Sequence, residues 1–205
     1  MADFTQADHT FIAHAHYTNA TDYVVVGTAD DVRSYLSGTI YIDHAPIEDA
    51  IANDPGITYE IQINNDDAGG NEFWNTVTTL TASTTASTME TLDAAANSGQ
   101  KVVPVAATTD LTMGDWVYIM DDGGAAGSEW AMVASISTGV SFNTVDNLTN
   151  SFTSGEDVFI LGVARWVVNL DLAGVAHVRV ICRNSDTTGH NWATHCRAKW
   201  ATDIE

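Results

Sequence analysis

Apolar and polar residues alternate in short runs along most of the chain, and this period of two predicts β-strands. The clearest run is ITYEIQI at 57–63, where every second residue from Ile57 to Ile63 is apolar. Further runs rich in β-branched and aromatic residues lie at 22–26, 38–43, 73–80, 101–106, 115–121, 129–136, 140–145, 157–162 and 165–172. The pattern therefore predicts an all-β protein.

Two segments carry helix signals that compete with this pattern. The first is DHAPIEDAIAND at 43–54, which has room for one or two turns. The second is STMETLDAAANSG at 87–99, where Ser87 and Glu90 have the spacing of a capping box and Gly99 could end the helix. We expect a short helix at most in each segment.

A change of composition divides the chain. Residues 81–98 are mostly Thr, Ser and Ala, which is typical of a linker, and the five short strand runs after them indicate a small barrel. The runs beyond the barrel resemble those before the linker. We therefore predict a β-sandwich built from both chain ends (21–80 plus 163–205), with an inserted small β-barrel at 99–162 and an N-terminal arm at 1–20. The alternative is two sequential domains followed by a terminal hairpin.

The stretch from His177 to Trp200 contains four of the seven Lys and Arg residues of the chain, and both cysteines. If its halves pair as an antiparallel hairpin about Gly189, Cys182 lies opposite Cys196. One face of that ribbon is then apolar and contains Val178, Val180, Cys182, Trp192, Cys196, Ala198 and Trp200. The other face is basic and contains His177, Arg179, Arg183, His195, Arg197 and Lys199. A slip of one residue in either strand would mix the two faces.

This basic face requires an anion, because Arg179 and Lys199 would lie directly opposite each other and like charges in that position cost stability. The anion is a carboxylate of the same chain, a carboxylate of a neighbouring subunit, or a nucleic acid or sulfated glycan. In the second case the face is a docking surface. We treat its residues as a hypothetical interface.

The same register turns Cys182 and Cys196 toward the core, either as buried thiols or as a cross-strand disulfide. Directly opposed cysteines reach disulfide distance only with some strain. The first residues, MADFTQADHTFIAHAHY, lack the basic start and long apolar run of a secretory signal peptide. We therefore expect synthesis in a host cytoplasm and reduced thiols, with oxidation as the alternative in an extracellular particle.

The charge of the chain restricts its partners. Against 27 Asp and Glu there are seven Lys and Arg, which gives a formal net charge of −20. Such a charge repels nucleic acids and anionic membranes, so we expect direct contact with neither. The scarcity of lysine suits a medium rich in salt or divalent ions, where screening weakens self-repulsion. The alternative is drift in a surface under little constraint.

Two histidines two residues apart, His14 and His16, would point to the same side of a strand and could begin a zinc or copper site. A third ligand is required, and His9, His44 and Asp43 are the available candidates. Chance spacing in an N-terminal arm is the favoured explanation of the pair. We therefore expect no metal and no cofactor, with His14 and His16 as weak candidates.

Catalytic motifs are absent from the sequence: there is no GxSxG, no HExxH and no phosphate-binding glycine loop. With 27 acidic residues, a pair of carboxylates spaced for a glycosidase carries no information without geometry. The acidic, glycine-rich loops at 64–72 and 120–129 have the composition of calcium loops but not the EF-hand spacing. The six tryptophans fall mostly in predicted strands, where core packing is the commoner role. We expect a protein that is not an enzyme.

A resemblance supports this expectation. Residues 98–161, with a GDWVYI strand, an acidic glycine turn and a strand ending in VASI, resemble a module of structural proteins from tailed bacteriophages. The flanking TYEIQINNDDAGGNEFWNTV and LDLAGVAHVRVICRN resemble the β-sandwiches of phage head and tail accessory proteins. The resemblance implies a virion structural protein, and in particular one that decorates or cements a capsid. It supplies no functional residues to carry over.

The sequence thus favours a non-enzymatic decoration protein on the capsid exterior, present in many copies. Its expected partners are the major capsid protein and further copies of itself. The alternative is a carbohydrate-binding module of a tail fibre or extracellular filament. An esterase or glycosidase is a weaker third hypothesis.

Overall fold

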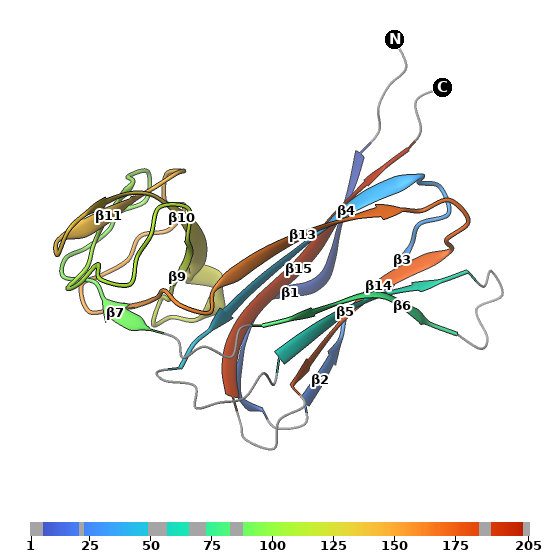
Figure 1. The fold of residues 1–205 in the computed structure, drawn as a ribbon, viewed down its shortest axis with the longest axis horizontal. Helices are drawn as coiled ribbons and strands as arrows, with labels where there is room; N and C mark the ends of the chain where they lie inside the picture. Colours follow the sequence, from blue (N-terminus) through green and yellow to red (C-terminus); the bar gives the residue numbers. More distant parts are fainter. Residues whose placement is uncertain are drawn as a thin grey trace, which may run out of the picture.

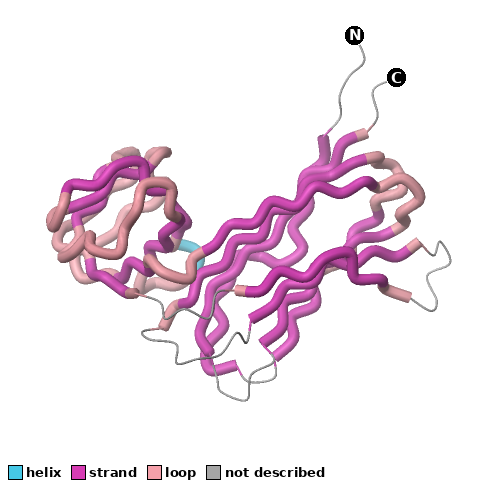
Figure 2. The backbone as a smooth tube through the Cα atoms, viewed as in Figure 1, coloured by secondary structure: helices cyan, strands magenta, loops and turns pink. Residues whose placement is uncertain are grey.

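Antiparallel β-strands make up almost all of the regular secondary structure in the described residues, so the all-β prediction is confirmed (Figures 1 and 2). A computed structural model describes residues 6–20, 23–48, 57–65, 73–82, 88–184 and 190–202. The strands form a two-sheet sandwich on the right of Figure 1 and a smaller barrel on the left. Within these residues the helical structure is a single 3₁₀ turn, η1 (Ala125–Gly127), and no helix is long and apolar enough to cross a membrane.

The first sheet of the sandwich has four strands from both ends of the chain. Their spatial order is β1 (Gln6–Ala20), β15 (His190–Ala201), β4 (Ser37–Pro46) and β13 (Ala164–Asp171). The last strand of the chain therefore lies inside this sheet, between strands from the first quarter of the sequence.

The second sheet has five strands. Four follow each other in the order β2 (Tyr23–Val26), β14 (His177–Asn184), β5 (Ile57–Asn64) and β6 (Asn75–Thr81), and β3 (Asp30–Asp31) also pairs with β14. The alternation predicted for 57–63 is present as far as Ile61, because Ile57, Tyr59 and Ile61 are buried, but Gln62 is buried as well and Ile63 only partly.

The inner faces of the two sheets form one apolar core. Its largest fully buried side chains are Trp192 and Trp200 from the first sheet and Tyr59 from the second. Burying a large apolar side chain contributes about 1.5–3 kcal/mol, so these positions dominate the stability of the sandwich. Trp200 packs directly on Gly38, where a Cβ atom would lie 2.1 Å from the indole ring. Gly38 therefore leaves the space that the indole occupies.

The predicted hairpin of β14 and β15 does not form. Cys182 on β14 is opposite Val25 and Tyr59, whereas Cys196 on β15 is opposite Ile12 and Ile42. The two strands follow each other in sequence but belong to opposite sheets. Alternation correctly indicated which face of each strand is apolar, and those two faces meet across the core instead of lying side by side.

The barrel is inserted between β6 and β13. Its strands are ordered β7 (Met89–Thr91), β12 (Asp157–Phe159), β9 (Trp116–Ile119), β10 (Glu129–Ser137), β11 (Ser141–Thr144) and β8 (Val102–Pro104). A bridge between Leu92 and Val105 joins the ends of the first and last strands and closes the barrel. It has its own core, with Val117, Phe142 and Phe152 almost fully buried.

Three predicted segments differ from the structure. The described part of the expected N-terminal arm (1–20) is not an arm but the strand β1, which pairs with β15. A bulge after Thr10 lets the consecutive residues Phe11 and Ile12 both enter the core. The expected helix at 87–99, from residue 88 on, forms β7 and turns, so strand pairing overrides helix propensity there. The expected helix at 43–54 is replaced by the end of β4 as far as Pro46, and residues 49–54 lie outside the described ranges.

Candidate functional site

The candidate site is the outer face of the four-stranded sheet, on the side away from the core. The antiparallel pairing of β4 with β15 and with β13 places side chains from the three strands beside one another in rows. From the chain termini toward the barrel, the rows are Lys199–Thr39–Asn169, Arg197–Tyr41–Val167 and His195–Asp43–Arg165. Three of the seven basic residues of the chain lie in this array.

Asp43 organises one end of the array. Its carboxylate is fully buried and accepts hydrogen bonds from Arg165 Nε and, at 2.6 Å, from Arg197 Nη1. The Thr194 hydroxyl donates to the Asp43 backbone oxygen at 3.0 Å, and the Arg197 guanidinium lies 5.5 Å from the centre of the Tyr41 ring. A carboxylate of the same chain therefore meets two of these cations and fixes their positions.

Lys199 differs from the two arginines. It is exposed, and neither a hydrogen bond nor an ion pair joins it to any residue in the described part of the chain. Two adjoining hollows, of about 380 and 290 Å³, share Lys199 and Tyr41 in their walls, and Asn169 and Arg197 line one each. The outer face is therefore an open trough with an exposed ammonium group, and Asp8 lies opposite Lys199 on β1 and lines one of the two hollows.

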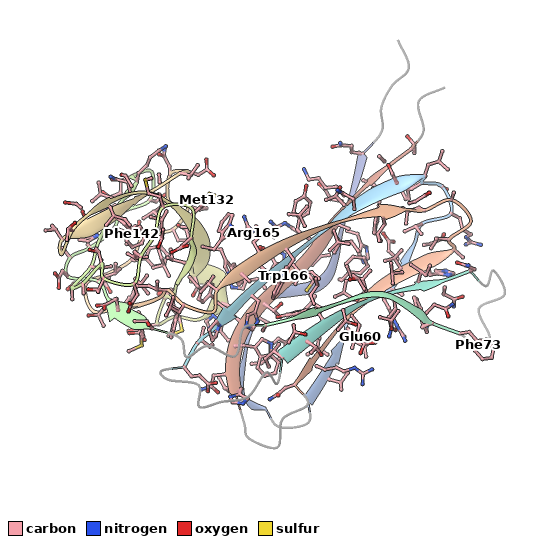
Figure 3. The ribbon with its side chains drawn as sticks, viewed as in Figure 1. Glu60, Phe73, Met132, Phe142, Arg165 and Trp166 are labelled. Atoms are coloured by element: carbon pink, nitrogen blue, oxygen red, sulfur yellow. The ribbon has the colours of Figure 1, made fainter. Side chains whose placement is uncertain are left out.

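The barrel bounds one end of this trough. Arg165 stacks over the Trp116 ring of β9 at 4.1 Å, and Trp130 Nε1 of β10 donates to the His44 backbone oxygen at 3.3 Å. Figure 3 labels Arg165 at the end of β13 beside the barrel and Trp166 next to it, which packs inward against Tyr59. A small shared apolar cluster, including Ala45, Ala193, Tyr118 and Phe159, completes the contact.

Two histidines of β1 contribute to the same junction. His14 Nε2 and His16 Nε2 lie 2.8 and 2.6 Å from the Tyr118 hydroxyl of the barrel. A hydroxyl donates only one hydrogen bond. At least one of the two imidazoles therefore donates an N–H to the hydroxyl oxygen. The predicted pair does lie on one side of its strand.

Burial keeps the junction histidines neutral. It lowers the pKa of His14 to about 4, with His195 and His16 adding to the effect and Asp43 opposing it. The pKa of His195 is lowered by burial and by Arg197, and that of His16 by burial. Burial also raises the pKa of the Tyr118 hydroxyl. These imidazoles are therefore uncharged at pH 7 and add no positive charge to the trough.

The remaining cations of the predicted basic face point away from the trough. Arg179 lies on the outer face of the other sheet, where its Nε donates to Gln62 Oε1 at 2.9 Å and its guanidinium stacks on Trp74 at 4.0 Å. Arg183 pairs with Glu60 at 3.1 Å on that face, and His177 belongs to the same strand. The prediction of one shared basic face is therefore wrong, because β14 and β15 lie in different sheets. Contact of any of these residues with a partner stays a prediction.

The two thiols lie in the sandwich core and are not linked to each other. Burial raises the pKa of Cys182 to about 12 and also raises that of Cys196. Thiols need the anionic form to react, so neither is an activated nucleophile.

The candidate third ligands do not join His14 and His16 in a metal site. His44 Nδ1 lies 2.9 Å from the Tyr59 hydroxyl in the core, His9 pairs with Asp30 at 3.2 Å, and Asp43 is held by arginines. Across the residues that the structure covers, no group of three or more His, Cys, Asp or Glu is arranged to hold a metal ion. Most of the acidic loop at 64–72 lies outside those residues.

Comparisons with known proteins give distant likenesses. No family model and no curated protein matches the chain. The SPBc2 prophage-derived protein YomS matches 98% of this chain with 97% of its own, at 8% identity and a TM-score of 0.35. PirA matches 94% of the chain with 96% of its own, at 8% identity and a TM-score of 0.28. The match to VP17, a capsid protein of bacteriophage P23-77, covers 98% of this chain and 98% of VP17, at 8% identity and a TM-score of 0.22. The structural neighbours thus include phage and capsid proteins, but scores below 0.5 do not establish a shared fold.

Proposed function

We propose that the protein is a non-enzymatic structural protein of a virion, and that it decorates or cements the capsid exterior through the outer face of the four-stranded sheet. The observation that carries the proposal is the open trough around Lys199. This trough presents an exposed cation on a molecule of net charge −20. The resemblance of the sequence to phage structural modules agrees with it.

Charge explains how such a face would select its partner. Most of this molecule repels an acidic surface on the capsid. Within the trough, Asp43 offsets part of the charge of Arg165 and Arg197, and Lys199 is the exposed cation, with Asp8 opposite it on β1. Complementary charge contributes mainly to orientation and association rate. The major capsid protein would therefore offer carboxylates opposite Lys199.

Several groups that a catalytic role could use make structural contacts instead. The thiols are buried with raised pKa values, and His14 is neutral and hydrogen-bonded to Tyr118. The basic residues beside the trough hold Asp43. This arrangement favours a binding face over a reaction centre.

The two lysines of the chain provide a matched test. Lys199→Glu reverses the charge in the trough, and Lys101→Glu makes the same change on the barrel, where the ammonium donates to the Val145 backbone oxygen at 2.5 Å. Copies per particle are counted by quantitative mass spectrometry of purified virions. We expect Lys199→Glu to reduce the number of copies per particle roughly tenfold or more, because it replaces an attractive charge pair at the interface with a repulsive one. Lys101→Glu should leave the number of copies unchanged. Full occupancy of the Lys199→Glu protein would refute docking through this face.

A carbohydrate-binding role is a second candidate, and one observation favours it. Tyr41 lines both hollows, and its hydroxyl has no partner in the described chain. Aromatic rings with nearby polar groups are the usual components of small-molecule sites. Binding of the isolated protein to immobilised polysaccharide, lost in Tyr41→Ala, would support this role over capsid docking.

A further inference from the structure

Strand β6 forms one edge of the five-stranded sheet. It pairs with β5 on one side, and no strand among the described residues pairs with its other side. Its sequence, NTVTTLT, contains no charged residue. Val77 on the strand is 48% exposed, and Phe73 just before it is 81% exposed (Figure 3). An uncharged, β-branched edge of this kind is suited to pairing with another strand.

The backbone direction of β6 identifies the free groups. The Ala82 N–H donates to the Ile57 oxygen on β5 at 2.9 Å. Backbone groups of alternate residues point to the same side of a strand. Leu80 and Thr78 therefore face β5, while the N–H and C=O groups of Thr79 and Thr81 point outward. A bulge at Val77 leaves Thr78–Thr81 in regular register.

Charge distinguishes this edge from the other sandwich edges. The edge strand β1 carries Asp8, and the edge strand β13 carries Arg165 and Asp171. Strand β2 is also uncharged but has only four residues, against seven in β6. Because two copies each bear a net charge of −20, they approach most easily along a neutral strip.

We propose that β6 pairs antiparallel with β6 of a second copy, about a two-fold axis at Thr79. In this register Thr79 lies opposite Thr79 of the second copy, and the two residues exchange N–H···O=C hydrogen bonds. Thr78 lies opposite Leu80 of the other copy on the core side of the joined sheet. Cross-strand pairs of such residues are favourable, and the two five-stranded sheets become continuous. The pairing does not depend on the proposed role in a virion.

Two substitutions at Thr79 test the contact by different means. Thr79→Pro removes the outward N–H, and an edge strand tolerates proline where its N–H faces solvent. Thr79→Lys keeps the N–H and sets two like charges opposite each other across the axis. Thr109→Lys, at an exposed turn of the barrel, makes the same charge change far from β6 and is the control.

Sedimentation equilibrium of the full chain over a range of concentrations, at a salt level that screens the net charge, measures the dimer dissociation constant. We expect a dimer for the wild type and for Thr109→Lys. Each Thr79 variant should weaken it roughly tenfold or more, since the two-fold axis doubles the effect of every lost bond. A monomeric wild type overturns the proposal. So do Thr79 variants that dimerise like the wild type, because the contact then lies elsewhere.

Discussion

The replacement Asp43→Asn tests the buried carboxylate at the end of the trough. The substitution keeps the shape of the side chain and removes its charge, which leaves Arg165 and Arg197 without their shared anion. Removing one partner of a buried ion pair costs about 3–5 kcal/mol. The two arginine side chains remain 24% and 34% exposed, so water compensates part of that cost. After this discount we expect the free energy of unfolding to fall by about 2 kcal/mol.

Urea unfolding followed by tryptophan fluorescence measures this change, and the slope with denaturant should stay constant. The loss should persist at high salt, because buried pairs are screened little. Asp8→Asn is the control: Asp8 is an exposed carboxylate on β1, and its loss should change stability by less than about 0.5 kcal/mol. If Asp43→Asn is as mild as Asp8→Asn, the carboxylate does not hold the arginines as described.

The pH dependence of stability and the reactivity of the thiols provide two further predictions. The pKa of His14 is about 4 in the folded protein, below the value of 6.5 in the unfolded chain. The contribution of this neutral ring to the free energy of unfolding is therefore complete above pH 6.5 and is lost as the pH falls toward 4. Because the ring is only half-buried, we expect a loss of about 1–2 kcal/mol, measured as a lower urea midpoint and reduced in His14→Gln. Cys182 and Cys196 should resist a thiol reagent in the native protein at pH 8 and react fully in denaturant, because burial raises both pKa values. Rapid labelling of the native protein would contradict their position in the core.

Local pattern predicted most of the strands and the direction of their side chains. Val180 on β14 and Ala198 on β15 are both buried, as the alternation required. The pattern could not select the partner strand. A period of two specifies which side of a strand is buried, but not which strand lies beside it. Two strands with apolar sides can be neighbours in one sheet, or can lie in two sheets whose apolar sides face each other. Cys182 and Cys196 were therefore given the right environment and the wrong neighbours.

The junction shows a second limit. The spacing of His14 and His16 predicted that they share a side of one strand, and both do approach the same hydroxyl. Tyr118, which carries that hydroxyl, is more than a hundred residues away in sequence, in the middle of an apolar strand of the barrel. Nothing local marks it as a partner. The bulges of β1 likewise hid a strand, because Phe11 and Ile12 break the alternation.

The position of β15 inside the first sheet determines the order in which the molecule can assemble during translation. The barrel is complete once the chain has passed β12, and all of its strands are close in sequence. The complete four-stranded sheet must wait for the final strand, since β1 and β4 do not pair with each other and are joined through β15. A ribosome that stops shortly before His190 would therefore release a folded barrel attached to an open, apolar half-sandwich, and such a product is prone to aggregation.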